Sequence, residues 1–283
     1  MKKKAKVPDS FGRVIYKGTQ HTLLTPWFPY LLVCILVIGY LSIYTPYIVD
    51  TSESLMYRIQ PSADRAYTYG ERHFNDTNPQ AYNIARAAYF FEQAQQYDTT
   101  LPYVHHQLAR IAFLRGDFAT ALAEINVQIQ QQGDSTPESY YVRGLIEGFQ
   151  GDYIDAEHDY AYFLQFDPYN WAGINDYVWV LLKDNKPREA VDLLAPVLPY
   201  FTHNAWLLNS DAIALSEIGD ATSAKERIDT AVQALQSLST NDWSHAYPGN
   251  DPRIASEGLD AFRAAVLSNM HRLHTGASAH AVE

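Results

Sequence analysis

The side chains in this sequence that could do chemistry are mainly histidines. His271 and His274 are three residues apart, a spacing that places both imidazoles on one face of a helix, where they could share a metal ion. No carboxylate or cysteine nearby completes a ligand set. His105 and His106 are adjacent, so on a helix they point about 100° apart and cannot easily bind one ion. The interpretation we favour is that the chain holds no metal and no other cofactor.

Two further short motifs have possible chemical roles. Glu157 and Asp159 flank His158, which is the one acid–base cluster that we could propose, although on an amphipathic helix such a cluster is typical of a solvated face. Asn75-Asp76-Thr77 is a glycosylation sequon, meaningful only in a host that glycosylates exported proteins. Motifs for phosphate binding, zinc binding or a nucleophile elbow are missing from the sequence. We therefore predict that the protein is not an enzyme.

The elements that position these residues repeat along the chain. "RGDFATALAEI" (Arg115–Ile125) and "QGDYIDAEHDY" (Gln150–Tyr160) share a register that places alanines 34 or 35 residues apart, at Ala87, Ala121, Ala156, Ala190 and Ala224. An apolar or aromatic residue stands four positions after each alanine, and Gly116, Gly151, Asn185 and Gly219 precede the last four. This period indicates stacked helical hairpins, in which the alanine allows close helix packing and the glycine ends the first helix.

The two quoted stretches and this register resemble the tetratricopeptide-repeat (TPR) family, over about residues 61–238. The resemblance implies an all-α fold, a right-handed α-solenoid of about five helix-turn-helix repeats. We expect the repeat domain at 62–238, a loop at 239–253, a capping helix at 254–274 and a disordered tail at 275–283. Asn78 and Pro79 would begin the first of the second helices. The second helices are expected near 79–97, 117–131, 152–166, 187–200 and 220–237.

The resemblance also implies a concave groove lined by the first helix of each hairpin, which would bind a protein or peptide partner. It places the following residues there: Tyr103, His106, Arg110, Phe113, Tyr141, Leu145, Phe149, Asn175, Asp176, Trp179, Lys183, Trp206, Asn209 and Ile213. Aromatic side chains with a few hydrogen-bonding groups are typical of peptide-binding surfaces, although packing between helices explains aromatic spacing equally well. His106, Arg110 and Tyr141 stand where chaperone-binding members of the family carry the Lys and Asn that clamp a carboxylate, which argues against a chaperone-tail clamp.

An uncharged stretch near the N-terminus predicts a membrane anchor. Residues 27–49 read "WFPYLLVCILVIGYLSIYTPYIV", long enough for a single-pass transmembrane signal-anchor helix contacting the lipid bilayer. Residues 1–26 are basic, so the positive-inside rule predicts a cytoplasmic N-terminus, a linker at 50–61 and an extracytoplasmic repeat domain at the cell membrane. The single cysteine, Cys34, excludes an intramolecular disulfide and a cysteine-based metal site.

Charge limits the choice of partner. The chain carries a net charge of −11, and because residues 1–26 are basic the remainder is more acidic still, which argues against nucleic acid. The sequence predicts a membrane-anchored scaffold for protein–protein interaction. The alternatives are an ancillary subunit of a protein-export or envelope-assembly complex and a self-assembling spacer, so a homo-oligomer is possible.

Overall fold

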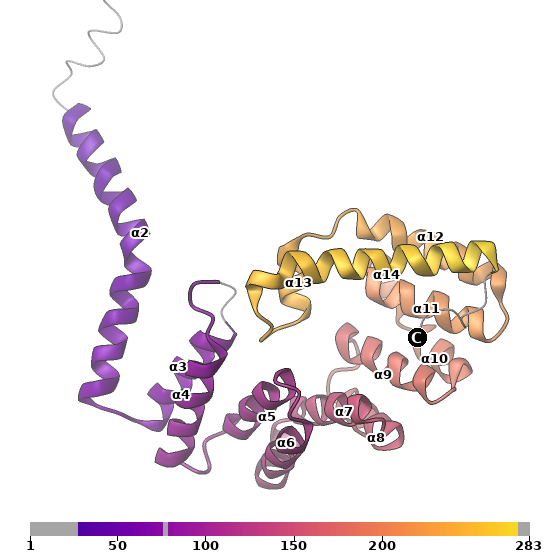
Figure 1. Cartoon of the computed structure of the whole chain (residues 1–283), viewed down its shortest axis with the longest axis horizontal. Helices are drawn as coiled ribbons and strands as arrows, with labels where there is room; N and C mark the ends of the chain where they lie inside the picture. Colours follow the sequence, from indigo (N-terminus) through magenta and orange to yellow (C-terminus); the bar gives the residue numbers. More distant parts are fainter. Residues whose placement is uncertain (1–27, 76–78, 277–283) are drawn as a thin grey trace, which may run out of the picture. The chain divides into compact units, whose positions relative to one another are not determined.

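The structure, a computed structural model, describes residues 28–75 and 79–276, and this part of the chain contains helices, turns and loops but no strand. The chain divides into two compact units, Met1–Pro61 and Ser62–Glu283. The second unit is a row of helical hairpins (Figure 1), so the predicted all-α solenoid is confirmed.

The first unit contains one long helix, α2 (Phe28–Ile59). The helix continues beyond the apolar run into a stretch whose sequence includes Asp50, Glu53 and Arg58. Within the described residues, no helix is both long enough and apolar enough to cross a bilayer. The predicted transmembrane helix at 27–49 is therefore not found, and the predicted single-pass location at the cell membrane, with a cytoplasmic N-terminus and an extracytoplasmic repeat domain, is wrong. The basic segment 1–26 and Trp27 lie outside the described residues.

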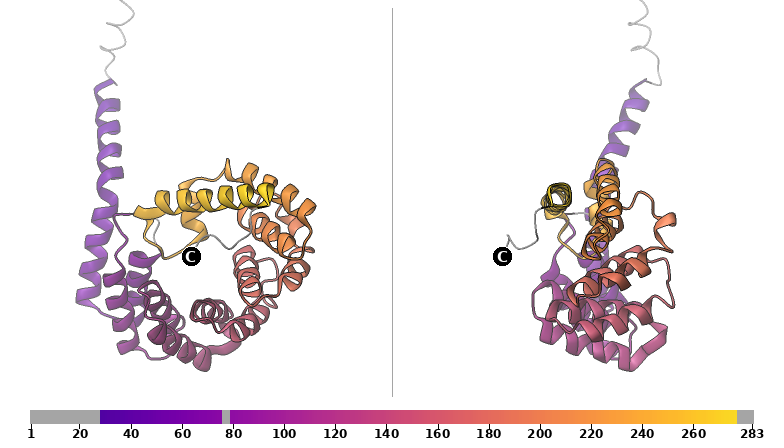
Figure 2. Two further views of the ribbon diagram at one scale, coloured as in Figure 1. Left: turned by 45° about the vertical axis from the view of Figure 1, so that its right-hand side comes forward. Right: turned by 90° about the vertical axis from the view of Figure 1, so that its right-hand side faces the viewer.

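Five hairpins form the body of the second unit. They pair α3 (Ala63–Phe74) with α4 (Ile84–Tyr97), α5 (Val104–Leu114) with α6 (Phe118–Gln132), α7 (Glu138–Gln150) with α8 (Tyr153–Phe163), α9 (Trp171–Lys183) with α10 (Pro187–Leu194), and α11 (Ala205–Glu217) with α12 (Ala221–Leu235). The hairpins follow one another around an arc (Figure 2), so the first helix of each hairpin after α3 contributes to its inner side.

The repeated alanines lie where the two helices of a hairpin meet. Ala87, Ala121, Ala156, Ala190 and Ala224 are all completely buried, as are the residues four positions further on, Phe91, Ile125, Tyr160, Leu194 and Ile228. A methyl group is small enough for two helices to approach closely, and the larger side chain one turn later packs against the first helix of its own hairpin, as the Phe91 ring does on Tyr67 and Phe74 of α3. The repeat in the sequence is thus a repeat of one packing contact.

The turn inside each of the last four hairpins has the same backbone geometry. Gly116, Gly151 and Gly219 have φ values of 75°, 90° and 89°, and Asn185 has 58°. The N–H of the next residue donates to a carbonyl five residues earlier, at 2.8–3.0 Å, in each of these turns. This left-handed ending closes the first helix and starts the second.

The ends of several second helices differ from the predicted ones. Asn83 caps α4 by accepting a hydrogen bond from the Arg86 N–H at 3.0 Å, so α4 begins at Ile84 rather than at Pro79. The predicted cap, Asn78, lies outside the described residues. Helix α10 ends at Leu194, short of the predicted 200, because Pro196 has no backbone N–H to continue the helical hydrogen bonds; a 3₁₀ turn, Leu198–Tyr200, follows.

Two helices follow the fifth hairpin. The predicted loop at 239–253 contains α13 (Thr240–Ala246), which starts with a capping box between Ser239 and Asp242, and a 3₁₀ turn at Pro252–Ile254. Helix α14 (Ala255–Thr275) packs on α12 and places Val266 in the core of the last hairpins. A Cβ on Gly258 would come within 2.5 Å of the Trp243 ring, so α13 and α14 are in close contact.

Candidate binding cavity on the concave face

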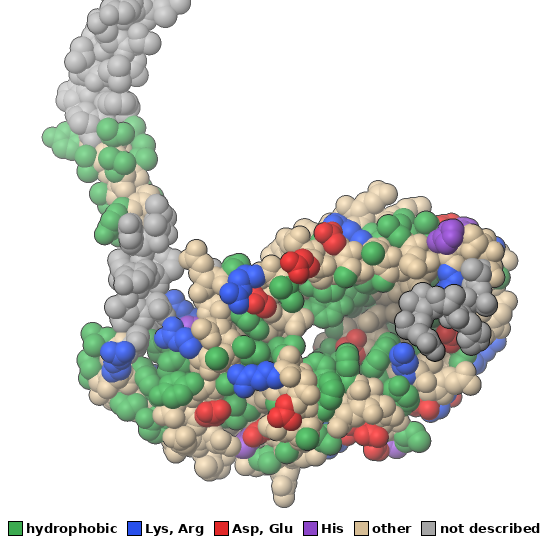
Figure 3. All heavy atoms as spheres, viewed as in Figure 1, with side chains coloured by type: hydrophobic (Ala, Val, Ile, Leu, Met, Phe, Trp, Pro, Cys, Tyr) green, Lys and Arg blue, Asp and Glu red, His purple; other side chains and the backbone are tan. Residues whose placement is uncertain are grey.

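The inner helices line a cavity of about 530 Å³. Figure 3 shows a hollow in this face with hydrophobic side chains on its walls. Helix α7 contributes Tyr141, Leu145 and Phe149, and α9 contributes Asn175 and Trp179, in both cases four residues apart and therefore on one helical face. From the predicted groove set, the cavity is lined by Arg110, Phe113, Tyr141, Leu145, Phe149, Asn175, Asp176, Trp179, Trp206 and Asn209.

Aromatic rings form much of the cavity wall and contact one another. The Phe149 ring lies 5.1 Å from that of Phe113 and 5.2 Å from that of Trp179, measured between ring centroids. On the other side, Trp206 stacks on Phe262 of α14 at 4.9 Å, and its indole N–H donates to the Tyr247 hydroxyl at 3.0 Å. Because each ring is held by its neighbours, the wall is organised before any ligand arrives.

A small hydrogen-bonded network supplies the polar part of the wall. The Tyr141 hydroxyl donates to Asp176 Oδ2 at 2.7 Å, and the Asn175 amide donates to Asp176 Oδ1 at 3.4 Å. The Ser210 hydroxyl in turn donates to Asn175 Oδ1 at 2.8 Å. Burial raises the pKa of Asp176 to about 6, although the hydrogen bonds from Tyr141 and Asn175 act in the opposite direction. The carboxyl group is therefore ionised at neutral pH and titrates close to physiological pH.

Arg110 contributes the positive charge of the cavity, but its guanidinium group is already engaged. It donates to the Pro248 carbonyl at 2.6 Å, to Gln107 Oε1 at 2.7 Å and to Asn75 Oδ1 at 3.2 Å. Its central carbon also lies 4.7 Å from the centre of the Phe74 ring, in a cation–π contact. Arg110 thus attaches a distant part of the chain to the first hairpins.

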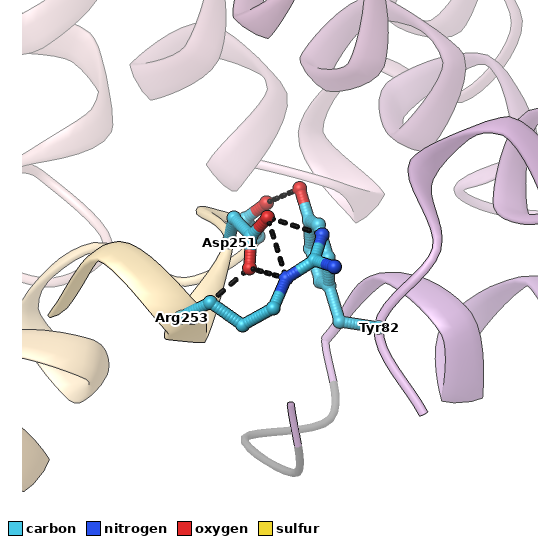
Figure 4. Close-up of polar contacts among 4 residues, drawn as sticks. Tyr82, Asp251 and Arg253 are labelled. Atoms are coloured by element: carbon cyan, nitrogen blue, oxygen red, sulfur yellow. Dashed lines mark hydrogen bonds and ion pairs between the residues drawn. The ribbon is translucent and has the colours of Figure 1, made fainter. Parts of the chain in front are cut away.

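That distant part, residues Tyr247–Asp251, is called the closing loop below because it borders the cavity and contacts the first hairpins. The Tyr82 hydroxyl, from the segment before α4, donates to the Gly249 carbonyl at 2.9 Å (Figure 4). Gly249 has a φ of 89°, and a Cβ there would lie 2.8 Å from Phe74 and 2.9 Å from Arg110. Glycine is therefore required at this position both for the backbone conformation and for the close approach.

Three of the predicted groove residues have other environments. Tyr103 is the N-cap of α5, and its hydroxyl donates to Glu138 Oε2 at 3.1 Å. His106 is buried, with Nδ1 3.1 Å from the Ser139 hydroxyl, and Lys183 is exposed in the last turn of α9. None of these three, nor Ile213, is among the described residues that line the cavity.

The histidines considered for chemistry are dispersed. His158 and His271 are exposed, and His274 Nε2 lies 2.8 Å from Asp229 at an exposed site. His105 is buried beside Glu124, 2.6 Å away. Among the side chains that the structure describes, no group of three or more His, Cys, Asp or Glu is placed to hold a metal ion. Asp76 and Thr77, the second and third residues of the Asn75 glycosylation sequon, lie outside the described residues.

The contribution of residues 246–250 to the cavity wall was not predicted from the sequence. Ala246, Tyr247, Pro248 and Asn250 line the cavity, together with Phe262, which belongs to the predicted capping helix. Trp171, at the first position of α9, and Ser210, one position after Asn209, also line it. The capping box at Ser239 would have revealed α13, but no local pattern indicates where the closing loop lies.

Solved structures similar to this chain are TPR proteins. A TPR protein from Parabacteroides merdae ATCC 43184 has a TM-score of 0.54 and 12% sequence identity, and the match covers 83% of this chain and 97% of that one. YrrB, described as a TPR protein with an unusual peptide-binding site, has a TM-score of 0.51 and 12% identity, with 69% of this chain and 93% of that one covered. MamA has a TM-score of 0.50 and 12% identity, with 62% of this chain and 98% of that one covered. No protein-family model and no curated protein matches the chain. The likeness establishes the fold, which is TPR-like, and confirms the resemblance at that level.

Proposed function

We propose that this protein is a protein-interaction module that holds a segment of a partner polypeptide in the aromatic cavity. The observation that carries the proposal is the cavity itself, which combines aromatic walls with a few polar groups converging from α5, α7, α9 and α11. Its volume of about 530 Å³ suits one or two large side chains rather than a whole folded surface. We thus propose the predicted groove set as the binding site, without Tyr103, His106, Lys183 and Ile213.

Two further points support a peptide ligand. The TPR-like fold of this chain is also the fold of YrrB, a TPR protein with an unusual peptide-binding site. In addition, the Phe149 side chain is 55% exposed although it belongs to the aromatic wall, so an incoming side chain can reach it from solvent. Aromatic side chains that are preorganised and accessible are the usual anchors of protein interfaces.

A peptide-display selection on the immobilised full chain tests this proposal. We expect enriched peptides to share an apolar or aromatic anchor residue, and to bind Trp179→Ala at least tenfold more weakly than the unaltered protein, since a central ring of the wall is lost. Ile154→Ala is the matched control, because Ile154 is 63% exposed on α8 and does not line the cavity. Selected peptides that bind both variants equally well would contradict the proposal.

A further inference from the structure

Asp176 is a carboxylate without a counter-charge. Among the ion pairs of the described residues none includes it, and its hydrogen bonds come from neutral donors, the Tyr141 hydroxyl and the Asn175 amide. Removing an ionised carboxylate from bulk water is costly unless a positive group lies beside it. The cavity therefore has a negative site whose charge a cationic ligand would neutralise.

Arg110 does not serve as that counter-charge. Its guanidinium group is held by the closing loop through the Pro248 carbonyl, by Gln107 and by the ring of Phe74. These contacts direct its charge towards the first hairpin, and Arg110 is not among the groups that perturb the pKa of Asp176. The two charged residues that line the cavity thus have separate roles: Arg110 attaches the loop, and Asp176 has hydrogen-bond donors but no counter-charge.

The rings that line the cavity with Asp176 are also suited to a cation. Trp171, Trp179 and Trp206 line the same cavity, together with the Tyr141 ring whose hydroxyl contacts the carboxylate. The face of an aromatic ring, of tryptophan above all, attracts ammonium and guanidinium groups, and the same surface packs well against the methylene stem of lysine or arginine. An aromatic wall with one carboxylate is a combination that recognises a cationic side chain.

We infer that the cavity selects peptides that carry a lysine or arginine, with the cationic group facing Asp176 and its stem lying against the aromatic wall. This inference rests on the proposed peptide-binding function and names the chemistry of its ligand. The overall negative charge of the chain, −11, favours the approach of a basic segment.

Peptides from the display selection provide the test. We expect a lysine or arginine at one shared position, and replacement of that residue by norleucine should weaken binding to the unaltered protein at least tenfold. Asp176→Asn should bind the basic peptide as weakly as the unaltered protein binds the norleucine peptide. The affinity of this variant should fall little further when the peptide also carries norleucine, because the two changes remove the same contact. The asparagine retains an oxygen that can accept the Tyr141 hydrogen bond, so the wall keeps its shape.

Controls separate the two proposals. Asp155→Asn, an exposed carboxylate on α8 outside the cavity, should bind the basic peptide as the unaltered protein does. Selected peptides that depend on Trp179 but contain no shared basic residue would overturn this inference and leave the peptide-binding function standing. Should the selection yield nothing, N-acetyl-lysine methylamide and its norleucine analogue are titrated directly, and equal responses of the tryptophan fluorescence would overturn it.

The pH dependence of binding gives a second readout. A bound cation favours the ionised carboxylate, so affinity for the basic peptide should fall as the pH is lowered through about 6, the pKa of Asp176. The titratable groups that interact with it, Tyr141, Tyr160 and Tyr247, have raised pKa values and stay neutral between pH 5 and 8. Arg110, the other charged residue that lines the cavity, stays positive over the same range. Asp176→Asn should abolish the dependence, and an unchanged profile in that variant would argue against the role of this carboxylate.

Discussion

His106 illustrates how a residue placed in the groove by sequence reasoning can have a structural role. Its ring is 7% exposed, its backbone N–H donates to Gln128 Oε1 at 3.2 Å, and Nδ1 contacts Ser139 of the next hairpin. Burial and, secondarily, the positive charge of Arg110 lower the pKa of His106 to about 3. The imidazole is therefore neutral at all pH values in the usual range, and it joins the second hairpin to the third.

The low pKa of His106 predicts a pH-dependent stability. Below pH 6.5 the unfolded chain binds a proton at this residue and the folded chain does not, so folding is opposed by up to about 1.4 kcal/mol per pH unit between about 6.5 and 3. His106→Asn should remove this contribution and give a shallower fall in the free energy of unfolding from pH 7 to 5, measured with urea. His203→Asn changes an exposed histidine and should keep the slope of the unaltered protein.

The closing loop is the element on which the shape of the cavity depends. Its residues border the cavity, and its contacts with the first hairpins run through the Gly249 backbone and the Pro248 carbonyl. Trp243 of α13 packs on Gly258 of α14 and so fixes the stem of the loop. The loop is thus held at both sides, by α13 and α14 behind it and by Tyr82 and Arg110 in front.

Gly249→Ala should release this loop from the first hairpins. The new methyl group would meet Phe74 and Arg110, and the left-handed conformation disfavours a side chain at the same position. We expect faster cleavage between residues 247 and 251 in limited proteolysis and a loss of stability of about 1–3 kcal/mol. Gly276→Ala is the control, because Gly276 has a φ of 69° with open space around it, so it introduces similar strain without a clash. Equal cleavage of the two variants would mean that the loop is not held by this contact.

Elements set by local patterns could be predicted from the sequence, and those set by distant contacts could not. The alanine and glycine register identifies the hairpins because each helix end depends on residues within one turn. The start of α4 was misplaced because Asn78 and Asn83 are both good caps, and the choice between them depends on how the chain packs. The membrane helix was predicted from residues 27–49 alone, without the charged continuation of α2.

At the scale of the whole molecule, the residues that the repeated inner helices contribute to the candidate site were predicted. The residues contributed by the closing loop and α14, which lie outside the repeat, were not. Tyr141, Leu145 and Phe149 could be placed together because they occupy equivalent faces of one inner helix. Tyr247 and Phe262 could not, because they reach the cavity from elements that lie outside the repeat. A solenoid groove built by repetition becomes a walled cavity only when the end of the chain returns to it.

This return also changes how the protein is expected to unfold. Stacked hairpins contact only their neighbours, so the two ends of such an array normally open independently. Here the bond between Tyr82 and Gly249 joins positions 167 residues apart and couples the first hairpin to the segment after the fifth. Opening at either end must break the same contacts.

Hydrogen exchange can measure this coupling. In Tyr82→Phe, amides in α3–α4 and in α13–α14 should exchange faster together, by roughly the factor of five that about 1 kcal/mol represents, while α7–α8 stays unchanged. Tyr89→Phe, which alters a tyrosine that is 52% exposed on α4, should leave every segment as it was. Faster exchange in α3–α4 alone would show independent ends; a joint change would mean that closure has turned a linear array into one cooperative folding unit.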